Sequence, residues 1–439
     1  MTIKKNSPWL KHGFWNVLEH GLIRLTDSLV SMTLLWVLVP ESFAKVALAQ
    51  AWVAPMLFLF VSPETVIYRD FSLWKSQGPA SLSANLRALR LFSWGKALAA
   101  ILIAVLSAFI FPVGDGFNQR FYLILWAFSL SLAPQLSGAD REFLRLDLKL
   151  KQLTAVTFCH KFSLLAGTVL VAFQYRNRMD LLAGVAIFST LLSTLLAHIW
   201  ARASLREMGA SARDLKTSHA NSFRVISEGL KTFSIWGHMS SVILNWVLSM
   251  DLFILGMVGL EARQLGIYAS VLKLANFSFA LPVALANLFS VWVGRKSAHV
   301  EEIEQVRTLS ARLFFGSLLQ AIIIAVLGPY LLAFLSRGRW SEFEQRQMAH
   351  WLYWILAGSV LISSTFLVTS WLALRGKLIP LVYRVYIPWG ISSLILYTGA
   401  IQLSHGSRTT AAAVTNVAIS LVFVLLLGIF LKTNDQGKA

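Results

Sequence analysis

The chain has 439 residues, of which 56% are hydrophobic and only 14% are charged. A typical soluble domain has about 25% charged residues, so this composition excludes an ordinary soluble protein and favours one that has lipid as its solvent. The single cysteine, Cys159, excludes an intramolecular disulfide and a cysteine-based metal or redox site. The formal net charge of +18 comes from Lys and Arg scattered over short connectors, which we interpret as topology signals rather than as a nucleic-acid surface.

Apolar blocks of about 18 to 25 residues follow one another along the chain, the length that a helix needs to cross about 30 Å of hydrocarbon. Because lipid offers the backbone no hydrogen-bond partners, we expect each block to be a helix. The sequence predicts spans at residues 14–38, 43–68, 88–112, 120–138, 152–173, 181–201, 233–258, 265–293, 312–335, 349–374, 378–402 and 410–431. The chain is therefore expected to be an all-α integral membrane protein with about twelve transmembrane helices.

The longest predicted connector divides these spans into two sets of six. We expect an N-terminal six-helix bundle at residues 1–201, a cytoplasmic linker at 202–232 and a C-terminal six-helix bundle at 233–439. Lys and Arg gather in the connectors on the side of the N-terminus, which is the side that the positive-inside rule assigns to the cytoplasm. The even number of spans then places both termini in the cytoplasm.

The two halves share a weak sequence similarity. Leu38–Ala47 and Leu260–Ala269 both contain a short acidic turn that is followed by a small residue at the start of the next predicted helix. Repeated halves are common in transporters, which place the substrate site between them. Chance similarity between two apolar hairpins is the alternative explanation.

The first predicted span has a polar stripe. At 100° per residue, one side of the helix over four turns carries Asn16, His20, Arg24, Asp27 and Ser31, with Glu19 close beside them. An ionised side chain near the bilayer centre costs at least about 2.5 to 3.5 kcal/mol, so a lipid-facing helix could not carry this stripe. The stripe predicts the wall of an aqueous cavity, or else a structural ion pair between Arg24 and Asp27, which are three residues apart.

Several other spans contain isolated polar residues, namely Lys161, Asn245, Asp251, Lys273, Asn276 and Arg384. Near mid-depth, cations outnumber anions, and this balance suits an anionic substrate head such as phosphate or pyrophosphate, whose oxygens a guanidinium group binds bidentately. The alternative for Lys161, Lys273 and Arg384 is that their charged ends extend to the membrane surface.

The carboxylates Glu19, Asp27 and Asp251, with His20 beside the first two, are the candidates for ion coupling or ion pairing. A carboxylate that is shielded from water can titrate near neutral pH, so proton or sodium coupling is expected to be possible. No phosphate-binding glycine motif of the nucleotide-hydrolysing type occurs, and we predict no cofactor and no metal.

Two sequence motifs resemble a known family. Asp251–Gly256 followed by Leu265–Ala269, and more weakly Leu38–Ala47, are similar to the signature hairpins of the polysaccharide (O-antigen type) flippases of the multidrug/oligosaccharidyl-lipid/polysaccharide exporter (MOP) superfamily. The first hairpin departs from that pattern, because Pro40–Lys45 lacks the usual glycine and tyrosine.

The resemblance implies two six-helix bundles that are related by pseudo-two-fold symmetry around a central cationic cavity. It implies that Arg24 and Lys273 lie where such flippases place cavity cations. The expected activity is the movement of an isoprenoid-pyrophosphate-linked oligosaccharide to the outer leaflet of a bacterial inner membrane, for surface polysaccharide assembly.

The function predicted from the sequence is therefore a flippase that works by alternating access, and not an enzyme. The predicted substrate-binding residues are Arg24, Lys161, Asn245, Lys273, Asn276 and Arg384. The predicted partners are a lipid-linked anionic glycan and membrane lipids, with no nucleic acid; the sequence indicates no protein partner.

Two alternatives stay open. One is a cation-coupled multidrug or metabolite antiporter of the same fold, with Asp27 and Asp251 as its ion sites. The other is a membrane glycan polymerase or glycosyltransferase. Such enzymes usually have a long outer loop, whereas the longest outer connector here is 336–348. We expect its charged residues Arg337, Arg339, Glu342 and Glu344 to be solvated.

Overall fold

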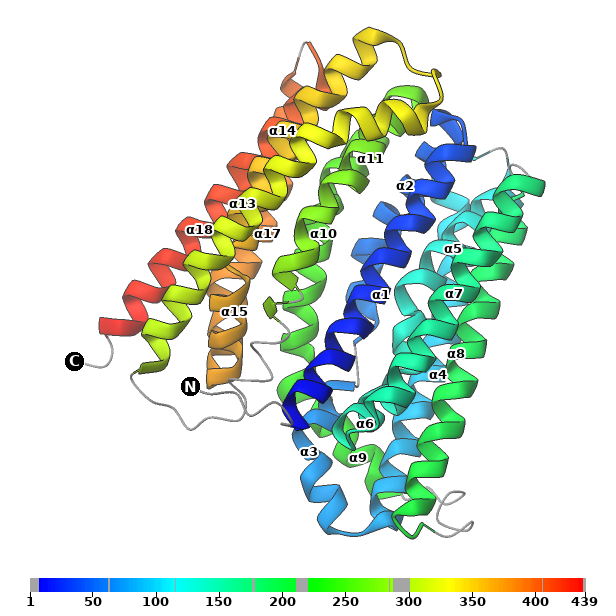
Figure 1. The fold of residues 1–439 in the computed structure, drawn as a ribbon, viewed down its shortest axis with the longest axis vertical. Coiled ribbons are helices and arrows are strands. Elements are labelled where there is room, and N and C mark those ends of the chain that lie inside the picture. The colour runs from blue at the N-terminus through cyan, green and yellow to red at the C-terminus, as the bar shows by residue number, and fades with distance from the viewer. Residues whose placement is uncertain are drawn as a thin grey trace. The chain divides into compact units, whose positions relative to one another are not determined.

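The computed structural model describes residues 8–61, 64–114, 116–175, 178–210, 220–283, 285–286, 301–404 and 406–436. Over these residues the chain forms helices and no strands, so the all-α prediction is confirmed (Figure 1). The first half contains α1 (Pro8–Val37), α2 (Pro40–Met56), α3 (Glu64–Ser76), α4 (Pro79–Ile110), α5 (Phe117–Leu136), α6 (Gly138–Leu146), α7 (Leu150–Gln174) and α8 (Met179–Glu207). The second half contains α9 (Ala220–Gly229), α10 (Ile235–Met257), α11 (Ala262–Ala275), α13 (Glu301–Ser336), α14 (Glu342–Ser363), α15 (Phe366–Leu372), α16 (Leu378–Leu381), α17 (Ile387–Leu403) and α18 (Arg408–Gln436).

The described part of the chain contains nine helical stretches that are long and apolar enough to cross a membrane. One of them is the 62-residue run Glu342–Leu403, which covers the predicted spans 349–374 and 378–402. This run bends at Arg375 and Gly376, where the backbone leaves helical geometry and Gly376 has a φ of 75°. Helices α1 and α5, at 30 and 20 residues, lie at the predicted first and fourth spans and are long enough to cross as well.

The second predicted span, 43–68, is interrupted. Helix α2 ends at Met56, a 3₁₀ turn follows at Leu57–Leu59, and α3 begins only at Glu64. Pro55 has no backbone N–H and its ring crowds the preceding turn, which explains why the helix ends here.

The chain divides into two compact units. The first contains residues 1–30 and 55–239, and the second contains residues 31–54 and 240–439. The last turns of α1 and almost all of α2 therefore belong to the second unit, although they come from the N-terminal part of the sequence.

In the first unit, the short helices α3, α6 and α9 lie together at one end (Figure 1). Each has an apolar side that packs into a shared core, whose fully buried members include Ile67, Trp74, Leu86, Phe143, Leu153, Leu205 and Ile226. None of these segments is long enough to span a membrane. The sequence predicts nearly all of α6 and all of α9 as connectors, whereas residues 64–68 of α3 fall within the predicted second span. Burial of one apolar face stabilises each of them as a short helix instead.

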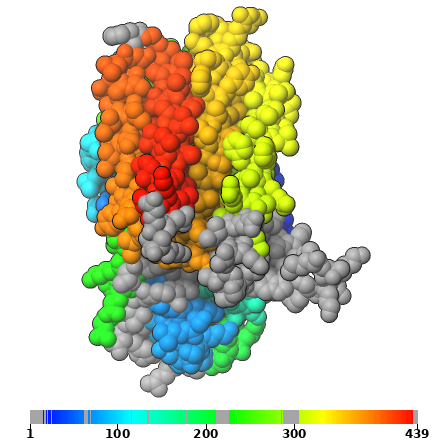
Figure 2. All heavy atoms as spheres, turned by 90° about the vertical axis from the view of Figure 1, so that its left-hand side faces the viewer, coloured from blue at the N-terminus to red at the C-terminus, as the bar shows by residue number. Residues whose placement is uncertain are grey.

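In the second unit, close helix packing depends on glycine. A Cβ atom on Gly266 would lie 1.9 Å from the carbonyl oxygen of Pro40, and one on Gly256 would lie 2.5 Å from Leu48. Both glycines belong to the sequence motifs described above. At Gly266 the backbone of α2 leaves no room for a side chain, whereas at Gly256 the contact is with the flexible end of the Leu48 side chain. Figure 2 shows α18 side by side with α17 and α14, and these pairs are in contact.

Candidate functional site

Glu19 is the best-described member of the polar stripe on α1. Its side chain is 1% exposed, and it accepts hydrogen bonds from Arg141 at 2.9 Å, from Arg145 at 3.1 Å and from Thr157 at 3.1 Å. Two guanidinium groups from α6 therefore neutralise this carboxylate inside the first unit. A fully hydrogen-bonded, doubly paired carboxylate holds α1, α6 and α7 together.

Asp27 forms an ion pair with Lys161 on α7, with 2.5 Å between Nζ and Oδ1. The Asp27 side chain is 48% exposed and the Lys161 side chain is 11% exposed. The local partner that the sequence suggested for Asp27 was Arg24, but the side chains of Asn16, His20 and Arg24 lie outside the described residues. The structure therefore places two predicted site residues, Asp27 and Lys161, in one contact between helices.

A second charged cluster in the first unit surrounds Asp140 of α6. Its carboxylate accepts hydrogen bonds from Arg90 of α4, with Nε 2.9 Å from Oδ1, and lies 3.5 Å from Nδ1 of His198. Burial alone would raise the pKa of Asp140, but the charge of Arg90 and hydrogen bonds from His198 and Arg90 outweigh burial and hold the pKa below its ordinary value. Asp140, Arg141 and Arg145 were missed at the sequence level. The signal that could have identified them is the amphipathic pattern of the segment Gly138–Leu146, in which charged residues recur at helical spacing.

The interruption of α2 is stabilised by two further polar groups that sequence reasoning missed. Lys96, which is 8% exposed, donates hydrogen bonds to the carbonyl oxygen of Val61 at 3.1 Å and to Gln135 Oε1 at 2.6 Å. Nε2 of His238 lies 2.8 Å from the carbonyl oxygen of Leu57 and must donate, because a carbonyl only accepts. Lys96 thus supplies a donor to the Val61 carbonyl, and His238 adds a second donor to the Leu57 carbonyl, which also accepts from the backbone amide of Phe60.

In the second unit, Lys273 of α11 donates a hydrogen bond to Gln50 Oε1 of α2. Gln50 was not singled out in the sequence, because a single amide in an apolar block gives no distinctive pattern. Asn245 is exposed on α10, where its side-chain amide donates a hydrogen bond to the backbone carbonyl of Ser241 at 2.9 Å. Asn276 is also exposed, at the start of a 3₁₀ turn. Arg384 is exposed in the π-helical segment Val382–Tyr386.

Asp251 is buried on α10, with 1% of its surface exposed. The hydroxyl of Tyr268 donates to Asp251 Oδ2 at 2.8 Å, and the backbone amide of Leu252 donates to Oδ1 at 2.7 Å. Among the residues that the structure describes, no Lys, Arg or His forms an ion pair with this carboxylate. Asp251 therefore differs from Glu19, Asp27 and Asp140, which all have cationic partners.

The connector 336–348 is only partly solvated, which corrects the expectation from the sequence. Arg339 donates to backbone carbonyls at the ends of two helices, among them Leu35 and Trp36 of α1 at 3.0 Å each and Ser336 of α13 at 2.7 Å. Glu344 accepts from Arg263 of α11 at 2.8 Å. These groups join the α1–α2 hairpin to the rest of the second unit, because helix-terminal carbonyls need donors.

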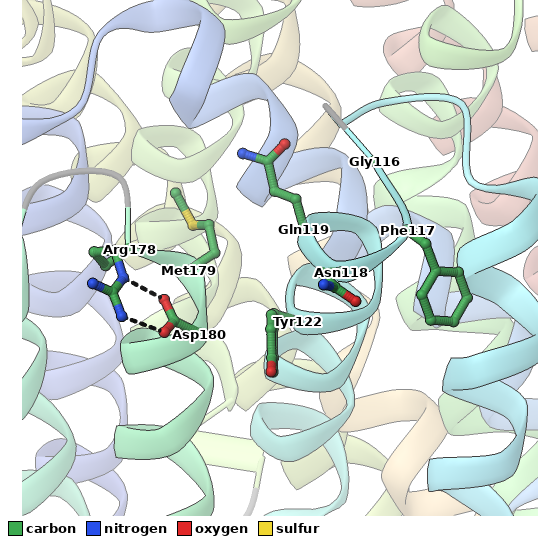
Figure 3. A pocket seen from close by; sticks show the side chains of 8 residues that line it. All are labelled: Gly116, Phe117, Asn118, Gln119, Tyr122, Arg178, Met179 and Asp180. Carbon is green, nitrogen blue, oxygen red and sulfur yellow. Dashed lines mark hydrogen bonds and ion pairs between the residues drawn. The ribbon is translucent and has the colours of Figure 1, made fainter.

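Two surface cavities, one in each unit, lie away from the predicted site residues. The first has a volume of about 570 Å³ and is lined by Asn118, Gln119, Tyr122, Arg178, Met179 and Asp180, among others (Figure 3). The second has a volume of about 580 Å³, and its lining includes Gln264, Gln347, Gln402, Ser407, Arg408 and Thr409.

The fold is similar to that of solved transporters. An inward-facing multidrug resistance MATE family transporter of the MOP superfamily has a TM-score of 0.70 and 12% identity, with 97% of this chain and 100% of that chain covered. The outward-facing conformation of such a transporter has a TM-score of 0.58 and 13% identity, with 97% of this chain and 96% of that chain covered. A third structure is a MOP superfamily transporter from Pyrococcus furiosus, described as having a binding pocket of reversed polarity that suggests a different function. Its TM-score is 0.66 and its identity 14%, with 95% of this chain and 93% of that chain covered.

No protein-family model matches the sequence, and no curated protein matches it either. At 12–14% identity the likeness shows the fold alone. This chain is a multi-pass membrane protein, and its fold is similar to that of MATE transporters of the MOP superfamily. The fold similarity agrees with the resemblance of the sequence motifs, but it establishes neither the superfamily nor the polysaccharide flippase branch.

Proposed function

We propose that the protein is a cation-coupled transporter of small organic solutes that works by alternating access. The observation that carries this proposal is Asp251, a buried carboxylate on a membrane helix with no cationic partner among the described residues. Keeping such a charge uncompensated costs several kcal/mol, so a transported proton or sodium ion would supply the missing positive charge.

Exposed polar groups within the helices support a water-filled pathway. The described helices expose many apolar side chains, such as Leu98 at 70%, as expected for lipid contact. Asp27, Asn245 and Asn276 are exposed as well, and contact with hydrocarbon would be unfavourable for them. Their exposure is explained if these positions face water within the membrane.

The fold similarity favours this class of substrate over a lipid-linked glycan. The similar structures include a multidrug resistance transporter in inward-facing and outward-facing conformations, and each similarity covers nearly all of both chains. We further propose that the protein resides in a bacterial cytoplasmic membrane, where membrane lipids contact its helices. The distribution of Lys and Arg indicates that both termini are cytoplasmic.

The proposal is tested with purified protein in liposomes and a cationic fluorescent dye as substrate. Asp251→Asn should reduce dye uptake driven by a proton or sodium gradient more than tenfold, because the amide cannot bind either ion as a carboxylate does. Asp180→Asn is the matched control, since Asp180 lies in a solvent-exposed ion pair with Arg178. Gradient-driven uptake that survives in Asp251→Asn would contradict the coupling role.

The second candidate substrate is a lipid-linked anionic oligosaccharide. The specific observation in its favour is Lys273, a cation within a membrane helix that donates a hydrogen bond to the neutral amide of Gln50. Lys273→Ala should then abolish surface glycan display while the protein stays in the membrane, and Lys432→Ala, at an exposed lysine near the C-terminus, should not. Normal glycan display from Lys273→Ala together with active dye transport would leave only the first candidate.

A further inference from the structure

The cavity at the start of α5 has a lining that the transport proposal does not use. It lies in the first unit, where the beginning of α5 meets the connection between α7 and α8. Figure 3 shows Asn118, Gln119 and Tyr122 of the α5 side across from Arg178, Met179 and Asp180. The volume of about 570 Å³ lies within the range of about 300 to 1,000 Å³ that is typical of small-molecule sites.

The charges of this cavity balance each other. Arg178 donates from Nε to Asp180 Oδ1 at 2.9 Å and from Nη2 to Oδ2 at 2.8 Å, a bidentate pair that Figure 3 marks with dashed lines. Among the lining residues that the structure describes, no other is charged. An anionic ligand would approach the Asp180 carboxylate and a cationic ligand would approach the Arg178 guanidinium, so the lining favours a neutral ligand.

Both donors and acceptors remain available in the cavity. In the part of the chain that the structure describes, neither the Asn118 amide nor the Tyr122 hydroxyl has a hydrogen-bond partner. An amide and a phenol can each donate and accept, and the Arg178–Asp180 pair adds a guanidinium donor beside carboxylate oxygens. A ligand with several hydroxyl groups, each of which also donates and accepts, matches this mixture.

Tyr122 adds a flat apolar surface. An aromatic ring has an apolar face and, in tyrosine, a polar end that hydrogen-bonds. A sugar ring likewise has one face of C–H groups and a rim of hydroxyl groups. Packing of the C–H face on Tyr122 would leave the hydroxyl groups directed at the Asn118 amide and at the Arg178–Asp180 pair.

We propose that this cavity is a binding site for a neutral carbohydrate of one or two sugar units. The lining contains none of the residues on which the transport proposal rests, so the site does not depend on the identity of the transported solute. A phospholipid headgroup is the competing occupant. The argument against it is that Arg178, the cation of the described lining, already donates from Nε and Nη2 to Asp180, so a phosphate group would have to displace that carboxylate.

The test uses the full-length protein in nanodiscs and saturation-transfer difference NMR. The probes are three neutral disaccharides, namely maltose, mannobiose and N,N′-diacetylchitobiose, together with glycerol 3-phosphate and phosphocholine as headgroup probes. We expect saturation transfer to at least one disaccharide, strongest at the C–H protons of one ring face, and none to the two phosphate probes.

The variants separate binding from folding. Tyr122→Ala should weaken the disaccharide signal at least tenfold by removing the ring, and Tyr122→Phe should keep most of it. Asn118→Ala, on the surface of the first turn of α5, should weaken binding without disturbing the helix core. Tyr330→Ala is the matched control, because Tyr330 is 76% exposed in the second unit and far along the chain from the cavity.

Two results would overturn the proposal. One is the absence of any disaccharide signal, or a signal that Tyr122→Ala and Asn118→Ala leave unchanged. The other is saturation transfer to glycerol 3-phosphate or phosphocholine alone, which would identify a lipid headgroup site. Either result leaves the Asp251 transport experiment unaffected, so failure of this site and failure of the proposed transport function are distinguishable.

Discussion

At the scale of single residues, two carboxylates of α1 are compensated by cations of the first unit. Glu19 has two arginine partners on α6, and Asp27 pairs with Lys161 on α7. A charge without such a partner is expensive away from water, so each pair also restricts how the helices that carry it can move. Asp251 is different, since a tyrosine hydroxyl and a backbone amide are its described donors.

A residue-scale prediction concerns the Arg90–Asp140 pair. Because the pKa of Asp140 is lower in the folded protein than in an ordinary carboxyl group, the pair contributes stability above pH about 4, and this contribution disappears as pH falls through the folded-state pKa. Asp140→Asn should destabilise the protein at pH 7 by about 3 to 5 kcal/mol, as expected for a buried pair that loses one partner.

The measurement is the thermal unfolding midpoint, followed by tryptophan fluorescence from pH 7 to pH 3. The difference between the unchanged protein and Asp140→Asn should shrink towards the acid end. Glu228→Gln serves as control, because its side chain is 69% exposed and its removal should change little at any pH. A difference that is independent of pH would show that the lowered pKa of Asp140 does not contribute to stability.

At the scale of elements, the packing of α11 against α2 requires a glycine at position 266. The Gly266 position has no room for a Cβ atom, because the Pro40 carbonyl oxygen occupies it, and backbone atoms cannot move aside as a flexible side chain can. The short helices α3, α6 and α9 depend on the opposite effect, since large apolar side chains such as Trp74 and Phe143 bury one face of each in a common core.

Substitution of Gly266 tests the close approach of α11 and α2. Gly266→Ala should force the two helices apart and lower the thermal midpoint strongly, with loss of folded protein in detergent extracts. The matched control is Gly399→Ala in α17, where a Cβ atom would meet nothing within 4 Å. There the higher helix propensity of alanine should leave stability unchanged or raise it by about 1 kcal/mol. Equal behaviour of the two variants would refute this account.

At the scale of the whole molecule, the chain order and the compact units do not coincide. Residues 31–54 belong to the second unit, whereas the residues on either side of them belong to the first. Helix α1 therefore contributes residues to both units: Glu19 and Asp27 of its polar side belong to the first, whereas Ser31 and the last turns belong to the second.

Water access along the helices provides the whole-molecule prediction. In a background that carries Cys159→Ser, a cysteine at Asn245 should react with a membrane-impermeant thiol reagent, because an exposed amide within a membrane helix indicates contact with water. A cysteine at Leu319 of α13, which is 61% exposed and apolar, should not react, because lipid covers it. Labelling of both positions, or of neither, would show that exposure here does not distinguish water from lipid.

The sequence alone was sufficient to predict the helical class and the approximate spans, because an apolar block of membrane-crossing length has only one way to satisfy its backbone in lipid. It also identified Asp27, Lys161 and Lys273 as polar residues within spans. It could not supply their partners. Lys161 is 134 positions from Asp27, and Gln50 is 223 positions from Lys273, and no local spacing links residues so far apart.

What the sequence by itself determined is thus a chain of membrane-length helices with charges that lipid would not tolerate, since length and polarity are local properties of each block. The tertiary structure alone decided which charges neutralise one another, that Asp251 is buried beside Tyr268, and that residues 31–54 join the second unit. The physical reason is that pairing, burial and close packing arise between segments distant in sequence, and only the folded arrangement of helices brings those segments into contact.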